Sequence, residues 1–241
     1  VAKNPSTVEY SFLEHCLRED LNDHAQRAMA VLRPIKLTIT NYPEGQSETF
    51  QVENNPNDPA AGTRSVTFSR HLYVEEEDFM EQPIPKYKRL YPEGPECRLK
   101  GAYLITCTGC VKDENGKVVE VHCTYDPESR GGNSPDGRKV KGTIHWVNAE
   151  QSVKAQVRLY ENIIDEEKGV YNEDGSLNLN PNSLTTLTEC RLEPAFAQAQ
   201  AYDRFQFVRQ GFFCVDYKDT KPGELVFNRI VSLKSSYVLP K

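Results

Sequence analysis

Long apolar runs are missing from this chain of 241 residues. No uninterrupted apolar stretch approaches the ~18 residues that a membrane-spanning helix needs, which argues against a membrane partner. The first ten residues, VAKNPSTVEY, are polar and contain no basic segment followed by an apolar one, so no export signal is indicated. The chain begins with Val1 rather than Met, and we expect it to be a C-terminal or internal piece of a longer protein.

The number of cysteines is odd, so they cannot all form pairs within the chain. The seven cysteines are scattered along the chain, which argues against the disulfide framework of a small secreted protein. The sequence also has no Asn-x-Ser/Thr acceptor for N-glycosylation whose middle residue is other than proline. Both features predict a protein of the reducing cytoplasm.

Familiar catalytic motifs are absent. The sequence has no G-x-x-x-x-G-K-[ST] phosphate loop, and its five histidines show neither metal-ligand spacing nor a Ser/His/Asp arrangement. The acidic run at residues 75–78 is more typical of a solvated face than of a metal site. We therefore expect no catalytic residue, no metal site and no cofactor in this chain by itself.

The net charge of −6 conceals two basic stretches. Residues 86–100 contain five basic residues against two acidic ones, and residues 136–158 contain five against two. Contacts to phosphates depend on local patches rather than on the total charge. The acidic balance therefore does not exclude a nucleic-acid partner.

The apolar pattern predicts helical structure only near the start. Ser6 and Glu9 have the spacing of a capping box, and apolar residues then recur at helical spacing over residues 12–21. We expect a second short helix over residues 24–29, and an end to helical structure before Pro34.

The rest of the chain is predicted to form strands and turns. Short alternating segments recur at roughly ten-residue spacing, which is typical of barrels or of a sandwich. Asn115-Gly116 is the strongest hairpin signal, because this pair tolerates positive φ at both central positions of the turn. The only tryptophan, Trp146, is expected in a barrel core or at a barrel junction.

A Cys-x-x-Cys pair, Cys107 and Cys110, precedes the adjacent residues His122 and Cys123. Thiolates at this spacing chelate zinc when a second, spaced pair completes a tetrahedral site. Adjacent residues on a strand point to opposite faces, so His122 and Cys123 make a poor second pair. Small residues on a hairpin are the preferred interpretation, and a zinc- or thiol-dependent β protein stays an alternative.

Two stretches combine basic and aromatic side chains. Residues 85–103 read PKYKRLYPEGPECRLKGAY, and residues 204–213 read RFQFVRQGFF. Proteins grip single-stranded RNA with cations on the phosphates, aromatic rings on splayed bases, and Arg or Gln on base edges. A solvated edge strand has a similar composition, so these stretches alone do not decide between the two interpretations.

Four segments carry a family resemblance that runs in order over nearly the whole chain. They are REDLNDHAQRAMAVLRPIKL, DGRKVKGTIHWV, QFVRQGFFCVD and VFNRIVSLK. Together they resemble the C-terminal anticodon-binding region of the glutaminyl-tRNA synthetases. The related eukaryotic and archaeal glutamyl-tRNA synthetases share the histidine-tryptophan motif, whereas the two closing segments are more similar to the glutaminyl branch.

The resemblance implies a mainly β fold. It consists of a helical linker and two β-barrels, which are related to those of a ribosomal protein that binds 5S RNA, with the second barrel inserted into the first. On this basis the helical linker is expected at residues 1–26. The proximal barrel is expected at residues 27–84 plus 175–241, and the distal barrel at residues 85–174.

The resemblance also implies which residues recognise the anticodon. Arg27, Gln206 and Arg209 match the positions for the middle base. The third-base region is represented by three residues of one short segment: Lys86, Lys88 and Arg89.

The first-base region departs from the family pattern. Where the family commonly has Arg-x-Arg, this chain has Arg98-Leu99-Lys100. Lysine offers a point charge where arginine offers a planar fork of donors. Arg98 and Lys100 are nevertheless the residues that the resemblance implies for this base.

The resemblance implies a glutamine-tRNA ligase as the parent protein, which attaches glutamine to tRNA(Gln) with ATP and magnesium. The HIGH-like and KMSKS-like motifs of the catalytic domain do not occur here, so that domain is expected elsewhere on the same polypeptide. We expect a monomeric protein that binds the anticodon loop of tRNA(Gln). A stand-alone relative of the 5S-binding ribosomal protein is an alternative, although the length of the chain suits two barrels rather than one.

Overall fold

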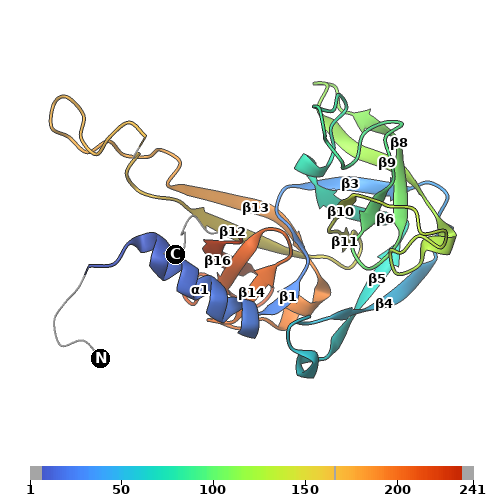
Figure 1. Cartoon of the computed structure of the whole chain (residues 1–241), viewed down its shortest axis with the longest axis horizontal. Helices are drawn as coiled ribbons and strands as arrows, with labels where there is room; N and C mark the ends of the chain where they lie inside the picture. The colour runs from blue at the N-terminus through green and yellow to red at the C-terminus, as the bar shows by residue number, and fades with distance from the viewer. Residues whose placement is uncertain (1–6, 166, 235–241) are drawn as a thin grey trace.

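A computed structural model describes residues 7–165 and 167–234 (Figure 1). Strands dominate these residues, and they form two barrel-like sheets, one nearly closed and one a half-barrel. The mainly β fold predicted from the sequence is therefore confirmed. In the described part of the chain, no helix is both long and apolar enough to cross a membrane.

Helix α1 (Tyr10–His24) packs across the end of the first sheet. Its Leu21, together with the following Ala25, is buried against Phe212 and Val231. The side chain of Arg18 donates to the carbonyl of Ser232 at 2.7 Å, which anchors the middle of the helix. Ser6, the expected capping residue, lies outside the described residues.

The second helix expected over residues 24–29 is wrong. Ala25 is already extended (φ −79°, ψ 133°), and β1 (Gln26–Ala28) pairs in parallel with β14 (Arg204–Phe207). Strand pairing with a segment almost 180 residues away overrides the local helical preference.

The first sheet has seven strands, and the C-terminal part of the chain supplies its centre. Besides β1 and β14 they are, in spatial order, β15 (Gly211–Val215), β16 (Leu225–Ser232), β12 (Val153–Tyr160), β13 (Leu184–Leu192) and β2 (Ala30–Val31). The sheet curls around four buried phenylalanines: Phe196, Phe207, Phe213 and Phe227. Phe196 comes from a 3-10 turn, η4 (Pro194–Gln198).

The second sheet also has seven strands and takes them from the intervening chain. In spatial order they are β10 (Gly142–Ile144), β7 (Cys97–Leu99), β8 (Leu104–Lys112), β9 (Val118–Tyr125), β3 (Pro34–Ile39), β6 (His71–Glu75) and β11 (Val147–Asn148). A separate hairpin of β4 (Ser47–Glu53) and β5 (Thr63–Ser69) extends it (Figure 1).

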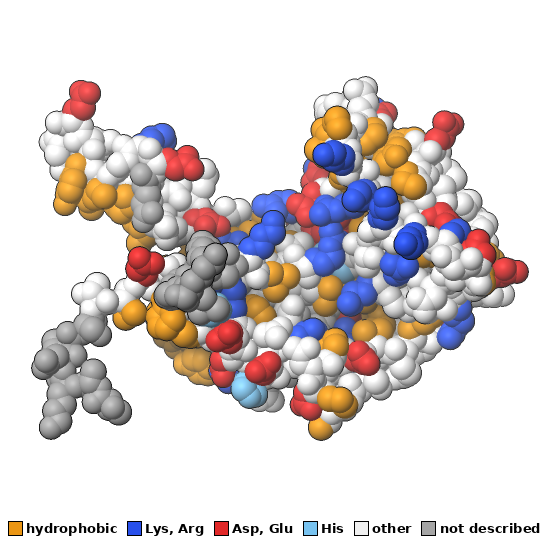
Figure 2. All heavy atoms as spheres, viewed as in Figure 1, with side chains coloured by type: hydrophobic (Ala, Val, Ile, Leu, Met, Phe, Trp, Pro, Cys, Tyr) orange, Lys and Arg blue, Asp and Glu red, His pale blue; other side chains and the backbone are white. Residues whose placement is uncertain are grey.

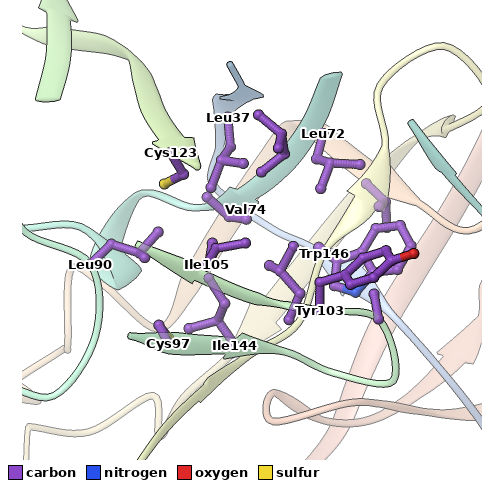
Figure 3. Close-up of a cluster of buried hydrophobic side chains, with 14 of the residues drawn as sticks. Leu37, Leu72, Val74, Leu90, Cys97, Tyr103, Ile105, Cys123, Ile144 and Trp146 are labelled. Carbon is purple, nitrogen blue, oxygen red and sulfur yellow. The ribbon is translucent and has the colours of Figure 1, made fainter. Parts of the chain in front are cut away.

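Trp146 lies in the core of this second sheet, as expected (Figure 3). Its side chain is fully buried, and its indole Nε1 donates to the carbonyl of Lys100 at 3.1 Å. The indole therefore fixes the chain just beyond β7, where two of the predicted site residues lie.

The edges of both sheets share one arrangement. In the first sheet the two edge strands, β1 and β2, are separated only by Met29, and in the second sheet β10 and β11 are separated only by His145 and Trp146. In each sheet, one bent stretch of chain thus supplies both edge strands. This arrangement curls the sheet toward closure and leaves little exposed edge.

Sheet membership differs from the predicted division at residues 84/85 and 174/175. β3, expected in the proximal barrel, pairs in parallel with β9 of the second sheet, and β12, expected in the distal barrel, pairs in parallel with β16 of the first. Both parallel pairs join strands far apart in sequence, and local patterns do not encode such pairs. The strands of the second sheet all lie between β2 and β12 in sequence, so one sheet is inserted into the other.

The predicted hairpin at Asn115-Gly116 is present between β8 and β9. Only Gly116 of this pair has a positive φ (79°). The carboxylate of Asp113 accepts from the backbone N–H groups of Asn115 and Lys117, each at 2.9 Å, and closes a longer turn than the two-residue form.

Candidate nucleic-acid interface

A basic hollow of about 580 Å³ lies where the segment after η2 (Glu76–Asp78) faces β10. It is lined by five cations from three distant parts of the chain: Lys86, Lys88, Arg89, Lys141 and Arg209. Four of these are predicted site residues, so the structure brings half of the predicted set into one place. Figure 2 shows Lys and Arg side chains gathered across the middle of the face in view.

The segment that carries three of these cations is fixed by its backbone. Leu90 is fully buried and donates from its N–H to the carbonyl of Asp78 at 3.0 Å, while its own carbonyl accepts from Met80. Lys86 adopts a positive φ of 70°, which turns the chain at the rim of the hollow. The loop is therefore held at both ends. Lys86 and Lys88 are exposed, whereas Arg89 is half-buried beside Asp78.

Gly142 of β10 allows this loop to approach the sheet. A Cβ atom at this position would lie 2.0 Å from the carbonyl oxygen of Lys88 and 3.1 Å from Sγ of Cys97. Only glycine leaves room for so close a backbone approach. One wall of the hollow thus depends on a missing side chain.

Arg209 reaches the hollow from the turn between β14 and β15. Its Nη1 and Nη2 donate to the two oxygens of Asp78, each at 2.7 Å. Burial lowers the pKa of Arg209, but the hydrogen bonds and charge of Asp78 outweigh burial and raise it. The guanidinium is therefore a permanent cation with a fixed orientation.

His145 supports Arg209 from below. Nη1 of Arg209 lies 3.2 Å from Nδ1 of His145, and Nε2 of the same ring lies 2.9 Å from the carbonyl of Ala30. Because the guanidinium donates to Nδ1, the ring proton is on Nε2, which faces the carbonyl of Ala30 and, at 3.3 Å, Oε1 of Glu75. The histidine-tryptophan motif thus connects the hollow to the chain between the two sheets.

Three further predicted residues form a second basic cluster. Arg27 of β1 and Gln206 of β14 are direct partners in the parallel pair, and Lys100 lies close enough to Arg27 for their charges to interact. Burial first, and then the charges of Arg27 and Arg64, lower the pKa of Lys100. The charge of Glu53 acts on Lys100 in the opposite direction and raises its pKa.

Two polar atoms of this cluster are buried without a partner among the described residues. They are Nε of Arg27 and Oε1 of Gln206. The other end of the Arg27 side chain is held by Asn22, whose side-chain oxygen accepts from Nη2 at 3.0 Å. Buried polar groups in folded proteins are nearly always hydrogen-bonded, so this donor and this acceptor on neighbouring strands are exceptions within the described fold.

Arg98 belongs to neither group. Its Nε donates to the carbonyl of Gly132, and its Nη1 donates to Oγ1 of Thr143, its register partner on β10, at 3.3 Å. Thr143 lines the basic hollow, so Arg98 reaches only the edge of the hollow.

The basic run at residues 138–141 has two roles. Arg138 is bound by three carboxylates, those of Glu96, Asp126 and Asp136, at 2.5–2.8 Å, and these partners raise its pKa. It therefore ties loops together. Lys139 and Lys141 line a neighbouring hollow of about 410 Å³ with Lys88, which places them beside the basic hollow as additional positive charge.

Sequence reasoning missed the acidic residues that hold this site. The run at residues 75–78 was expected to be solvated, but the side chains of Glu75 and Asp78 are buried. Glu75 accepts from the backbone N–H groups of Leu32 and Arg33 at 2.7 and 2.9 Å, and from the side chain of Gln210 at 2.7 Å. The partners of Glu75 lie more than 40 residues away, and Arg209 lies 131 residues from Asp78, so nothing in the local pattern indicated burial.

Comparisons with known proteins show the family of the chain. Two family models, each described as "tRNA synthetases class I (E and Q), anti-codon binding domain", match residues 25–126 and 143–216. The chain belongs to this family. Its match to these models confirms the resemblance derived from the four sequence segments.

Several curated relatives of this chain are named glutamine–tRNA ligases. It is 52% identical to a glutamine–tRNA ligase of Clostridium kluyveri over 243 residues, which cover 100% of the chain and 43% of the relative. It is 54% identical to that of Clostridium perfringens, covering 99% of the chain and 43% of the relative. The enzyme of Bradyrhizobium diazoefficiens is 49% identical, with coverage of 98% and 42%. The chain thus spans less than half the length of these relatives.

The Cys-x-x-Cys pair of this chain lies on β8, beside β9. Cys107 and Cys123 are cross-strand partners in the β8–β9 pair, whereas Cys110 pairs with Val121 and His122 with Gly109. A hydrogen bond from Cys123 lowers the pKa of the Cys107 thiol and raises that of Cys123. Among the described residues no three His, Cys, Asp or Glu side chains are placed to hold a metal ion, so the zinc alternative gains no support.

Proposed function

We propose that this chain recognises the anticodon loop of tRNA(Gln) as the C-terminal part of a glutamine-tRNA ligase. The observation that carries the proposal is the basic hollow, which joins three cations of one loop to Arg209 from the opposite end of the sequence. The family match and the names of the relatives agree with an anticodon ligand.

The hollow suits an unpaired, splayed nucleotide. Its walls combine cations with the side chains of Met80, Ile84, Pro85 and Tyr87. An anticodon loop offers unstacked bases whose edges are open to side chains, which a continuous A-form duplex hides. The cations attract the phosphates, and the apolar wall receives the face of a base.

Middle-base recognition is assigned to Arg27, Gln206 and Arg209. Arg27 and Gln206 are register partners on neighbouring strands, and a guanidinium and an amide side by side can together bond the edge of one base. A good bidentate contact of this kind discriminates between bases by about 1–3 kcal/mol.

Third-base recognition is assigned to Arg89, with Lys86 and Lys88 as phosphate or base contacts beside it. The first base is assigned to Arg98 and Lys100. Arg98 uses two of its guanidinium nitrogens within the fold, and the remainder of its five N–H donors serve the RNA.

The parent protein is proposed to attach glutamine to tRNA(Gln) with ATP and magnesium, through a catalytic domain on the same polypeptide. The chain covers about 43% of its relatives, which leaves room for such a domain. A cytoplasmic location agrees with seven cysteines that are all free thiols. A monomeric state stays a prediction. The alternative of a stand-alone 5S-binding protein gains nothing from the comparisons.

Binding of this chain to anticodon stem-loops at two salt concentrations tests the proposal. Loops with CUG or UUG are expected to bind best, and binding should weaken as salt rises because phosphate contacts release counterions. Arg209→Lys keeps the charge that balances Asp78 but removes the planar fork, so it should abolish most of the preference at the middle base. The matched variant Lys139→Ala should weaken all loops alike or leave them unchanged. Equal binding of every loop would overturn the assignment.

A further inference from the structure

We propose that Asp78 is a positioning residue that couples recognition of the middle and third anticodon bases by holding Arg209 and Arg89 on one buried carboxylate. The inference rests on the proposed function, because it takes Arg209 and Arg89 as the groups that meet those two bases. It adds a residue that belongs to no basic or aromatic pattern in the sequence.

The two oxygens of the Asp78 carboxylate have different numbers of arginine partners. Oδ1 of Asp78 accepts from Nη2 of Arg209 at 2.7 Å and also lies 2.9 Å from Nη1 of Arg89, whereas Oδ2 accepts from Nη1 of Arg209 at 2.7 Å. The two guanidinium groups therefore meet at a single oxygen atom. Bidentate arginine–carboxylate contacts are among the strongest and most directional in proteins.

Asp78 itself has little freedom to adapt. Its side chain has 0% exposure, and it ends the 3-10 turn η2, where its carbonyl accepts from the N–H of Leu90 at 3.0 Å. Arg209 has a positive φ of 68°, a conformation that non-glycine residues keep only where the surroundings impose it. The carboxylate is thus a fixed point rather than a flexible counterion.

Both arginines nevertheless keep part of their surface at the hollow. The side chains of Arg89 and Arg209 are 36% and 24% exposed, and both line the hollow. Each therefore has donors left for a base while Asp78 holds the rest of its guanidinium.

A shared anchor makes the two contacts interdependent. When the third base satisfies Arg89, this arginine stays on Oδ1 and the position of the carboxylate under Arg209 is maintained. When that base is wrong, Arg89 loses its outer partner, rearranges and alters the charge that orients Arg209. A wrong base at one position should therefore weaken discrimination at the other, since residues in one ion-pair network behave non-additively.

A cycle of four anticodon stem-loops tests this coupling with the unaltered 241-residue chain at low salt. The loops carry the CUG anticodon, a changed middle base, a changed third base, or both changes. Each single change is expected to weaken binding. The loss of affinity for the double change should be smaller than the product of the two single losses, by a factor of about five or more. A factor of about five is the lower end of typical coupling between sites.

Two variants identify Asp78 as the origin of the coupling. In Asp78→Asn the charge is gone, so both single-base losses should shrink and the double loss should equal their product within about twofold. The matched control is Glu77→Gln, on the same turn. Glu77 is 69% exposed and lies 3.5 Å from Arg89, and no bond to Arg209 is found for it in the described structure, so the coupling should persist.

The outcomes separate the inference from the function. If neither single change affects binding, the proposed base recognition fails, and the inference fails with it. If each single change weakens binding but the losses multiply in the unaltered chain, only the coupling is overturned. That comparison needs no variant, so it decides the question even if Asp78→Asn does not fold. Persistence of the coupling in a folded Asp78→Asn chain would also overturn the inference.

Discussion

Glu193 lies against Arg64 in a bidentate ion pair, with contacts of 2.5 Å from Nε and 2.8 Å from Nη2. Arg64 belongs to the β4–β5 hairpin, and Glu193 follows β13 of the other sheet. The same carboxylate accepts from the N–H of Met29 at 2.7 Å, at the bend between β1 and β2. One buried acid therefore ties the β4–β5 hairpin to the end of β13 and to the bend between β1 and β2.

Glu193→Gln should destabilise the chain strongly. Breaking one partner of a buried ion pair leaves the other charge uncompensated and costs about 3–5 kcal/mol. Urea unfolding at neutral pH measures the loss. Glu189→Gln is the matched control, because Glu189 pairs with Lys154 at 2.7 Å while 62% exposed, and such surface pairs contribute about 0–1 kcal/mol. Equal losses for the two variants would contradict the role of Glu193.

Gln206→Leu should remove much of the preference at the middle base without harming the fold. Its Oε1 is buried and has no partner among the described residues, so replacing the amide forfeits no internal bond of that oxygen. Stem-loop binding and thermal unfolding together check both parts.

Gln210→Leu, four residues along the chain from Gln206, should show the opposite behaviour. Its Nε2 donates to Glu75 at 2.7 Å. Loss of that bond should cost about 1–3 kcal/mol of stability while the base preference is retained. If both glutamine variants altered stability and preference in the same way, the distinction between them would be wrong.

Gly142→Ala should displace the loop that carries Lys86, Lys88 and Arg89. The added methyl group would meet the carbonyl of Lys88 at 2.0 Å, so the loop must move away and the hollow must change shape. Overpacking of this kind costs about 1–3 kcal/mol, and binding of every stem-loop should weaken. Gly109→Ala on β8 is the control, because no atom lies within 4 Å of its added methyl group. Unchanged binding by Gly142→Ala would contradict the contribution of this loop.

Acid should remove the stabilisation that Glu75 provides. Burial raises the pKa of Glu75, but hydrogen bonds from His145 and from the backbone of Leu32 and Arg33 outweigh it and hold the pKa below its usual value of 4.5. A carboxyl group with a depressed pKa in the folded state stabilises that state above its unfolded pKa, and this contribution is lost as the pH falls through the folded pKa. The free energy of unfolding of the unaltered chain should therefore fall faster below about pH 4.5 than that of Glu75→Gln. Parallel curves between pH 3 and pH 7 would refute this.

Much of the architecture could be predicted from local patterns. The alternation of apolar residues indicated strands, Asn115-Gly116 marked a hairpin, and Trp146 was expected in a core, where it lies. The basic residues of the hollow were also visible, because the three cations Lys86, Lys88 and Arg89 are close in sequence. What these patterns did not contain was the pairing of distant strands, which places residues 26–28 of the expected helix in β1.

The sequence by itself therefore determined the strand content, the helix at the start and the family, since these depend on local spacing and on residue identity. Only the tertiary structure decided which cations share a site. It placed Arg209 beside Arg89 and buried Asp78 between them. The physical reason is that a carboxylate tolerates burial only when cations or N–H donors surround it, and for Asp78 one of those cations lies 131 residues away.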